Sequence, residues 1–488
     1  MSAMIPSELR EPPPAGHPPA INLVPHAVAA LAQELVADHA HVASLFRRSE
    51  QRTWALASLH GHVLELERTA MEPMALAFTQ RVPGGDVQAM QQFISQGAWD
   101  DDAVLERHQA LVADPRGAAA TGVLILDGGA VPKPGPPSVG GARPWGGALG
   151  NVAQCQARVG ACSARKHGDT LVDRRLSLPE SWFTAAYQAR RAQGGVPDDV
   201  PCHMRPEVAG AIFARLVQRG ALPVGWVLWD EQVGNHPTLL DQIAAATRGS
   251  LAEGPHKPRG GRQRPPPSVP AARGKRGRRP RRARLRPEAP APPRVAELAA
   301  EVPPRAWQRY QMTEGATGPL VAEFAVLRVV PGRDGLPGQA SWVVLRRRLG
   351  EQPDVTTSLA NAPAVTPRRT VVAPRGMRWC GERSILERTR DCGLDHYEGR
   401  GGRGWHHPRT MRLLAQHVLV RQRRRLGETS SRLDRAAGAG GVPDGAAAAR
   451  PRRRNSDCAH SVHPRAERCG LSLPPTSDRA SARRFVTN

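Results

Sequence analysis

Apolar residues recur three and four positions apart from about residue 26 to residue 115, in stretches such as AVAALAQEL and VQAMQQFISQ. This spacing places the apolar side chains on one face of a helix. The pattern therefore predicts a helical domain over 26–115. The residues before it, 1–25, are polar and rich in proline, and we expect them to be disordered.

The pattern changes after residue 116 to short apolar runs that end in an acid. GVLILDGG at 122–129 and VGWVLWDE at 224–231 are typical of buried strands that lead into loops. We expect further strands near 151–158 and 169–177 and a helix over 205–219. Strands mixed with helices at this spacing indicate an α/β sheet over 116–256.

A strongly basic stretch separates this region from the next. Residues 257–286 contain thirteen Lys and Arg and no acid, together with many Pro and Gly, so we interpret 257–294 as a basic linker or an exposed arm. A DNA-contacting arm and a solvated linker fit this composition equally well.

Beyond the linker, alternating apolar positions at 320–330 and 341–349 predict strands of a β-rich insertion over 295–375. Helical stretches from about 381 and over 409–424 fall in the next segment, 376–426. In the second of these, His406 and His407 are expected to pack at the helix start, and an apolar stripe to join the core. The stripe comprises Met411, Leu414, Ala415, Val418 and Leu419. Residues 427–488 lack periodicity and predict a disordered basic tail.

The charge of the chain narrows the choice of partner. The 488 residues carry a formal net charge of +24, and only four of the 68 basic residues are lysines. Arginine grips phosphate oxygens in pairs, so nucleic acid is the leading partner, although a GC-rich genome would also raise the arginine content. No apolar run is long enough to span a membrane, and the N-terminus lacks a secretory signal. We therefore expect a cytoplasmic, nucleoid-associated protein.

Three acids stand where a metal site could form. Asp127 and Asp230 each follow a predicted buried strand, at the edge of the sheet where α/β folds place ligands. Glu382 lies three and four positions before Ile385 and Leu386, on the buried face of its predicted helix. The alternatives are that each aspartate only begins a turn and that the glutamate only complements a helix dipole.

Eight stretches give the sequence a family resemblance. They are LERTAMEPMALAF (66–78), QQFISQGAWDDDAVLERHQALV (91–112), GVLILDGGAVPKPGPPSVGGAR (122–143), LVDRRLSLPESW (171–182), WVLWDEQVGNHPTLLD (226–241), RVVPGRDGLPG (328–338), LANAP (359–363) and RWCGERSILERTRDCGLDHYEGR (378–400). In this order they resemble bacterial insertion-sequence transposases of the DDE superfamily, in the insertion sequence seven-hundred-one group, which is related to the insertion-sequence-four group.

The resemblance implies a ribonuclease H-like catalytic core with a β-rich insertion, preceded by a helical DNA-binding domain. It places the family's catalytic acids on Asp127, Asp230 and Glu382, which would hold two Mg²⁺ ions, with Mn²⁺ as a substitute. Such a site cuts transposon ends and joins them to target DNA. Lys133, Arg143 and Arg378 would contact the DNA, and a homodimer is expected where two ends are brought together.

The chain also departs from the family pattern. Gly128, Pro134 and Thr389 replace a glutamate and two lysines, Ile385 replaces an aromatic residue, and Pro408 replaces a histidine. The three acids are retained, so metal binding remains expected. The two missing lysines would hold DNA phosphates, so their loss should impair positioning of the DNA strand. The alternative is a catalytically impaired transposase remnant that only binds DNA.

Overall fold

The computed structural model describes most of the chain between residues 25 and 439. The described residues are 25–63, 70–79, 87–113, 122–133, 138–142, 145–146, 151–152, 154–165, 168–198, 200, 202, 204–220, 222–230, 233, 237–246, 249–253, 260–262, 264–265, 267–268, 284–285, 293–315, 318–333, 336–349, 355–378 and 399–439. Arg143, Glu382 and Thr389 lie outside them, as do residues 1–24 of the predicted leader and most of the predicted tail.

A mixed sheet forms the centre of the protein. Within the described residues it has twelve strands in the order β12-β13-β15-β16-β8-β7-β1-β5-β2, with β6 beside β5 and with β14 and β9 beside β13. The central strands are β1 (Gly122–Pro132), β5 (Cys155–Arg165), β6 (Gly168–Leu176), β7 (Val224–Trp229) and β8 (Gly249–Glu253). Of the described strand pairs, β1–β7 and β7–β8 are parallel and the others are antiparallel.

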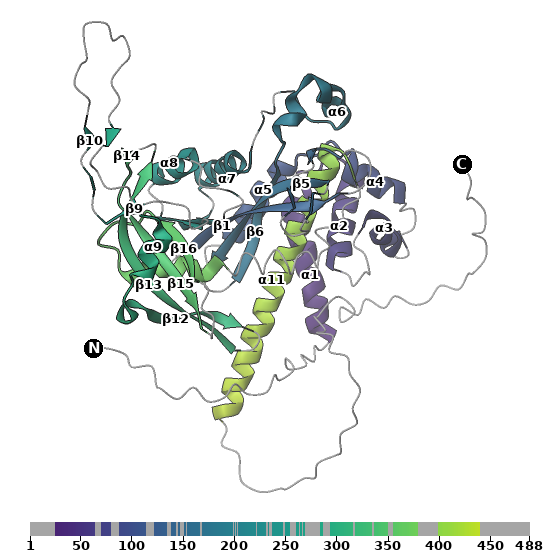
Figure 1. Ribbon diagram of the computed structural model, residues 1–488. Coiled ribbons are helices and arrows are strands. Elements are labelled where there is room, and N and C mark those ends of the chain that lie inside the picture. Colours follow the sequence, from purple (N-terminus) through teal and green to yellow (C-terminus); the bar gives the residue numbers. More distant parts are fainter. Residues whose placement is uncertain are drawn as a thin grey trace.

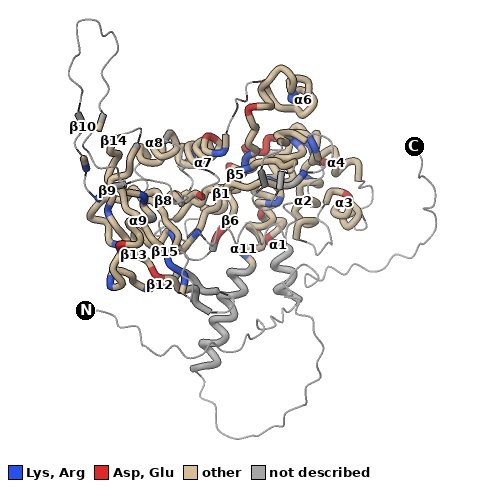
Figure 2. The backbone as a smooth tube through the Cα atoms, viewed as in Figure 1, with Lys and Arg blue, Asp and Glu red and all other residues tan. Residues whose placement is uncertain are grey.

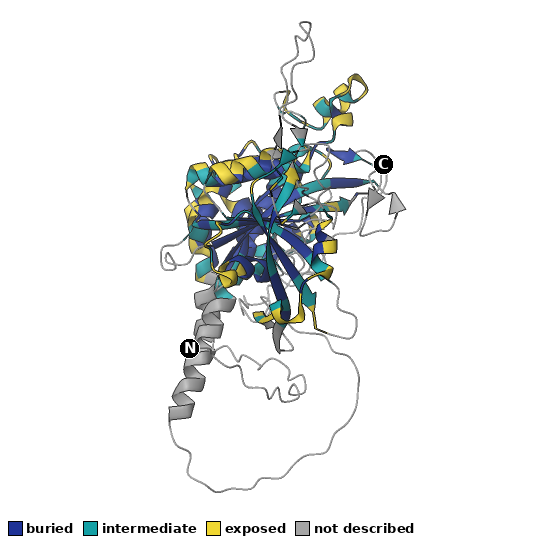
Figure 3. Cartoon of the chain, turned by 60° about the vertical axis from the view of Figure 1, so that its left-hand side comes forward, coloured by how far each residue is buried: buried dark blue, intermediate teal, exposed yellow. Residues whose placement is uncertain are grey.

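Helices cover both faces of the central strands. Leu124 and Leu126 of β1 pack with α7 (Arg205–Arg219) and α8 (Pro237–Ala245), whereas Val123 and Ile125 point to the opposite face. There they share a core with α5 (Asp101–Ala113) and α11 (Gly402–Ala439). Because strands covered on both faces need apolar side chains at every position, the continuous run GVLIL forms such a strand. Figure 3 shows these central strands as buried.

Five N-terminal helices gather around α11. They are α1 (Pro25–Ala43), α2 (Ser49–Val63), α3 (Met71–Thr79), α4 (Val87–Ser95) and α5. Their apolar residues, such as Val42 and Met90, form one core with Met411, Leu414, Ala415 and Val418 of α11. Figure 1 shows α11 running between these helices and the sheet. The predicted apolar stripe is therefore core at these four positions, while Leu419 is half-buried.

The predicted β-rich insertion extends the central sheet. β12 (Gln308–Gly315), β13 (Gly318–Arg333), β15 (Ser341–Arg348) and β16 (Val355–Ala360) form an antiparallel run, and β16 pairs with β8. One face packs on α9 (Val295–Ala300). In Figure 2, Lys and Arg positions recur along β12, β13 and β15. Arg309 and Arg347 of this region both bind the carboxylate of Glu323, so part of this charge is internally paired.

Short elements complete the described chain. The strands are β2 (Gly141–Ala142), β3 (Trp145–Gly146), β4 (Asn151–Val152), β9 (Gly260–Gly261), β10 (Pro267–Ser268), β11 (Arg284–Leu285) and β14 (Leu336–Pro337), and the helices are η2 (Glu180–Phe183), η3 (Ala185–Tyr187), α6 (Gln188–Gln193) and η4 (Pro304–Ala306). β9 pairs with β13, so part of the predicted linker is joined to the insertion.

The structure confirms some predicted elements and corrects others. The helix over 205–219 and the strands at 320–330 and 341–349 are confirmed by α7, β13 and β15. The prediction that residues 427–439 are disordered is wrong, because α11 continues to Ala439. Arg, Gln, Leu, Glu and Ala favour helices even where no apolar stripe marks one. None of the described helices is long and apolar enough to cross a membrane.

Candidate active site

Two of the predicted acids lie beside each other in the central sheet, Asp127 within β1 and Asp230 directly after the end of β7. In the parallel pair β1–β7, Leu126 is the register partner of Trp229, and Asp127 and Asp230 are the next residues of their strands. Neighbouring strands lie about 4.8 Å apart, so the backbones of the two acids are side by side.

Both acids belong to the same face of the sheet. Ile125 and Leu228 are two residues before Asp127 and Asp230, and both contribute to the core that includes α5 and α11. Because side chains alternate along a strand, each acid projects to the face of the residue two positions before it. This alternation places both carboxylates on the same face of the sheet, at the point where β7 ends beside β1.

Asp230 is held in place by its own turn. Its side chain is 5% exposed, and its Oδ1 accepts a hydrogen bond from the backbone N–H of Val233 at 2.9 Å. Asp230 thus begins a turn, as the structural alternative predicted, and also stands at the sheet edge beside Asp127. The hydrogen bond limits the rotation of the carboxylate and fixes its orientation.

Asp127 has a basic neighbour that the sequence did not suggest. It is half-buried and lies opposite Gly160 of β5, while Arg158 lies opposite Gly129. Burial lowers the pKa of Arg158, and the charge of Asp127 partly offsets that shift. The register of β1 against β5, which the sequence does not give, is the signal that reveals Arg158.

The basic residues predicted to contact DNA lie at different distances from the two acids. Lys133 is 9% exposed and lies six residues beyond Asp127 on the same strand, roughly 20 Å away along it. Arg378 ends the helical residues 368–378, where Val371 and Val372 pack in the same core as Ile125. The structure therefore separates Lys133 from the acids and puts the Arg378 helix on their face of the sheet. Arg143 lies outside the described residues.

The chemistry of the acids fits a hard divalent cation, because carboxylate oxygens are the ligands that Mg²⁺ prefers. Asp127 and Asp230 supply two such groups. Among the described residues no cluster of three or more His, Cys, Asp or Glu side chains could hold a metal ion. Glu382, the third predicted acid, lies outside the part of the chain that the structure describes.

Comparison with known protein families matches residues 41–319 to the DDE superfamily endonuclease family. The match covers more than half of the chain. The chain belongs to this family. The matched region includes Asp127 and Asp230 and ends before Glu382. The family implies a ribonuclease H-like core, nuclease or transposase activity, a DNA substrate and divalent metal ions. No match was found among curated proteins.

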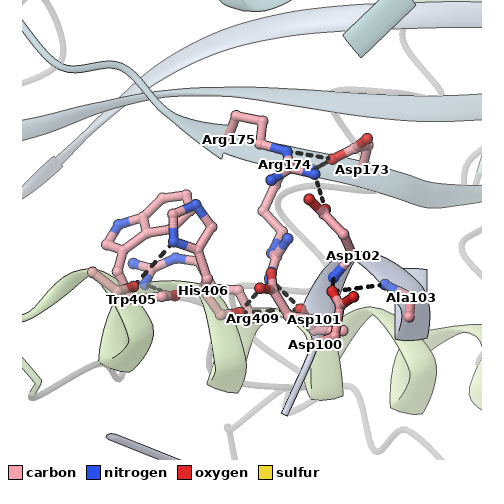
Figure 4. A network of polar contacts seen from close by, with 12 residues as sticks. Asp100, Asp101, Asp102, Ala103, Asp173, Arg174, Arg175, Trp405, His406 and Arg409 are labelled. Carbon is pink, nitrogen blue, oxygen red and sulfur yellow. Dashed lines mark hydrogen bonds and ion pairs between the residues drawn. The ribbon is translucent and has the colours of Figure 1, made fainter. Parts of the chain in front are cut away.

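A second cluster of charges in this family member is paired internally (Figure 4). It joins the start of α5 to β6 and α11 through the Arg174 side chain, which is 3% exposed. The Arg174 guanidinium group lies 3.3 Å from the Asp101 carboxylate and donates hydrogen bonds to the backbone carbonyl of His406 and to the hydroxyl of Thr410. Arg175 pairs with Asp102 and Asp173, and Arg215 of α7 lies 2.6 Å from Asp173.

The motifs WDDD and VDRR of the resemblance meet in this cluster. Asp100 begins α5 by accepting the backbone N–H groups of Asp102 and Ala103, which leaves Asp101 to face Arg174. Burial raises the pKa of Asp101, but the charges of Arg174, His406, His407 and Arg175 outweigh it and hold the pKa at about 2. Asp101, Asp102 and Asp173 each have an arginine partner, so the cluster is structural rather than a metal site.

Proposed function

We propose that this chain is an insertion-sequence transposase of the insertion sequence seven-hundred-one group, which binds transposon ends and carries out DNA strand cleavage and strand transfer. The observation that supports this most is the adjacency of Asp127 and Asp230 on one face of the sheet. A pair of fixed carboxylates at a sheet edge is the part of a two-ion nuclease that folding must supply.

In this proposal Asp127, Asp230 and Glu382 hold two Mg²⁺ ions, for which Mn²⁺ can substitute. When bound, the ions stabilise the attacking and leaving oxygens at phosphorus. The chain itself orients its carboxylates, as Val233 does for Asp230, and neutralises phosphates with Arg378, Lys133 and Arg143.

The reaction has two displacements at phosphorus. Water first attacks the phosphodiester at the transposon end, a P–O bond forms, the bond to the 3′ oxygen breaks, and the leaving oxygen takes up a proton. The free 3′-hydroxyl then attacks a target phosphodiester, loses its proton and displaces the target's own 3′ oxygen. No bond to the protein forms in either step.

The positions of the basic residues suggest how DNA lies on the protein. Lys133 is roughly 20 Å from Asp127 along β1, so it would contact the flanking duplex rather than the scissile phosphate. A homodimer would bring two such surfaces to the two transposon ends. The stretch 257–286 would add a DNA-contacting arm.

The test compares cleavage of a labelled duplex that carries the DNA flanking the gene. The wild-type chain is expected to nick it only with Mg²⁺ or Mn²⁺, and Asp127→Asn, Asp230→Asn and Glu382→Gln are expected to lose nicking but keep DNA binding. Asp198→Asn is the matched control, because the Asp198 side chain is fully exposed in the loop after α6.

Two results would contradict the proposal in different ways. Binding without metal-dependent nicking by the wild-type chain would instead support the impaired remnant, in which Gly128, Pro134 and Thr389 have removed activity. Nicking that persists in Asp127→Asn and Asp230→Asn would exclude these carboxylates as the metal site.

A further inference from the structure

Arg158 lies on the same face of the sheet as the two acids. Cys162 and Ala164 of β5 belong to the core that contains Ile125, and Arg158 shares their side of the strand by alternation. It is opposite Gly129, two residues past Asp127, which is roughly 7 Å along the strand.

Two glycines leave room for its guanidinium group. A Cβ added at Gly129 would lie 3.2 Å from Cζ and from one terminal nitrogen of Arg158, and one added at Gly160 would lie 3.6 Å from the other terminal nitrogen. The guanidinium group thus lies over the backbone of Gly129 and Gly160, next to Asp127. The missing side chains also allow another backbone to approach closely here.

The charge on Arg158 is incompletely balanced. Its Nε is buried and has no hydrogen-bond partner among the described residues, and Asp127 is the acid whose charge acts on it. A metal ion on Asp127 would place more positive charge beside the guanidinium group. A phosphate oxygen beside the guanidinium group would supply both a negative charge and a hydrogen-bond acceptor.

We propose that Arg158 binds a non-bridging oxygen of the DNA phosphate next to the scissile phosphodiester. This inference rests on the proposed function and adds a contact that positions the strand. The planar guanidinium group donates two parallel hydrogen bonds to phosphate, which fixes direction as well as distance. Arg158 is closer to the acids than Lys133 is, so it would set the register of the strand at the cut.

Arg165 supplies a matched control on the same strand. It is also half-buried, with an unpartnered Nε among the described residues and a pKa lowered by burial. It lies seven residues from Arg158, roughly 23 Å away at the other end of β5. A general effect of removing a half-buried arginine would therefore appear in both positions.

The experiment measures how salt weakens binding of a fluorescein-labelled duplex of mixed sequence by the full chain with Ca²⁺ present. Each phosphate contact contributes about −0.9 to the slope of log affinity against log salt. We expect Arg158→Gln to lose one such contact. The factor by which Kd rises from about 50 to about 200 mM salt should then be about 3.5-fold smaller than in the wild type. Arg165→Gln and Arg158→Lys are expected to keep the wild-type slope.

Two further measurements separate this inference from the proposed function. Mn²⁺ binding without DNA should persist in Arg158→Gln and weaken in Asp127→Asn. Arg158→Lys should bind DNA normally but nick it more slowly or at shifted positions, because an ammonium group cannot form the paired contact. Circular dichroism melting checks that each variant folds.

The results decide the two ideas independently. Equal slopes for Arg158→Gln, Arg165→Gln and wild type would overturn the phosphate contact, even if metal-dependent nicking requires Asp127. Absence of metal-dependent nicking in wild type would overturn the proposed function, while a reduced slope confined to Arg158→Gln would still support a phosphate contact at this position.

Discussion

Asp127 and Asp230 follow directly after Leu126 and Trp229, which are register partners in the parallel strands β1 and β7. The proximity of the two acids is therefore a consequence of strand pairing. The acids are 103 positions apart in the sequence, and the register of β1 against β7 brings their backbones together. Any change that shifts this register would separate the acids without altering either one.

The hydrogen bond of Asp230 separates its structural role from its chemical role. Asp230→Asn keeps an oxygen that accepts the Val233 N–H, so we expect its free energy of unfolding to stay within about 1 kcal/mol of wild type. Asp230→Ala loses the acceptor and should be destabilised by about 1–3 kcal/mol. Both variants should lose nicking.

Urea unfolding and the nicking assay on the same samples check this prediction. Full nicking by Asp230→Asn would show that the carboxylate charge is not needed. Equal stability of the two variants would show that the turn does not depend on this bond.

The buried charge cluster should contribute far more to stability than a surface pair. Asp101→Ala leaves the Arg174 guanidinium group buried without its carboxylate, and we expect a loss of about 3 kcal/mol. Glu301→Ala, which breaks an exposed pair with Arg262, should cost less than about 1 kcal/mol. Similar losses from the two substitutions in urea unfolding would refute a stabilising role for the cluster.

The buried histidines of α11 predict a loss of stability at mildly acidic pH. The pKa of His406 and of His407 is lowered to about 4, chiefly by burial and also by the charge of Arg174, against an opposing effect of Asp101. The unfolded chain therefore binds protons first as the pH falls, since its histidines titrate near 6.5. The contribution of the two neutral histidines to the free energy of unfolding is complete above about pH 6.5 and is lost progressively as the pH falls toward 4.

We expect the free energy of unfolding to fall by roughly 4 kcal/mol between pH 7 and pH 5, about half of it from each histidine. His407→Gln should reduce this dependence, although it also removes the ring that stacks on Trp99 at 3.8 Å, so slopes against pH are compared rather than absolute stabilities. His41→Gln changes an exposed residue and serves as the control. A flat pH profile in the wild-type chain would contradict the prediction.

The sequence predicted elements whose own residues determine them. Leu124 and Leu228 lie in short, continuous apolar runs, which are typical of buried strands. The spacing of apolar residues in α7 identifies the face of that helix that packs on the sheet. Asp127 and Asp230 could be selected because each ends such a run. Glu382 was selected from helix spacing and the resemblance, and it remains a prediction.

Features that depend on pairing between distant segments were not predicted. β5 reads CQARVGACSAR, whose small residues have no strong alternation, so neither its limits nor the position of Arg158 followed from the sequence. Asp101 and Arg174 are 73 positions apart, and each looks like an ordinary surface charge in its local sequence. Their burial depends on how α11 packs across β6, which local patterns do not encode.

The packing of α11 against the N-terminal helices predicts that the two unfold together. Leu414 is 3% exposed and lies in the core formed with α1–α5, so Leu414→Ala should leave a cavity and cost about 2–5 kcal/mol. Leu76→Ala removes the same atoms from a side chain of α3 that is 48% exposed, and should cost less than about 1 kcal/mol. Hydrogen exchange of α2 and α4 amides should accelerate in Leu414→Ala, because losing this contact weakens the whole core. Unchanged exchange in those helices would show that they are stable without α11, and a domain that moves independently on DNA would then be the better description of residues 25–113.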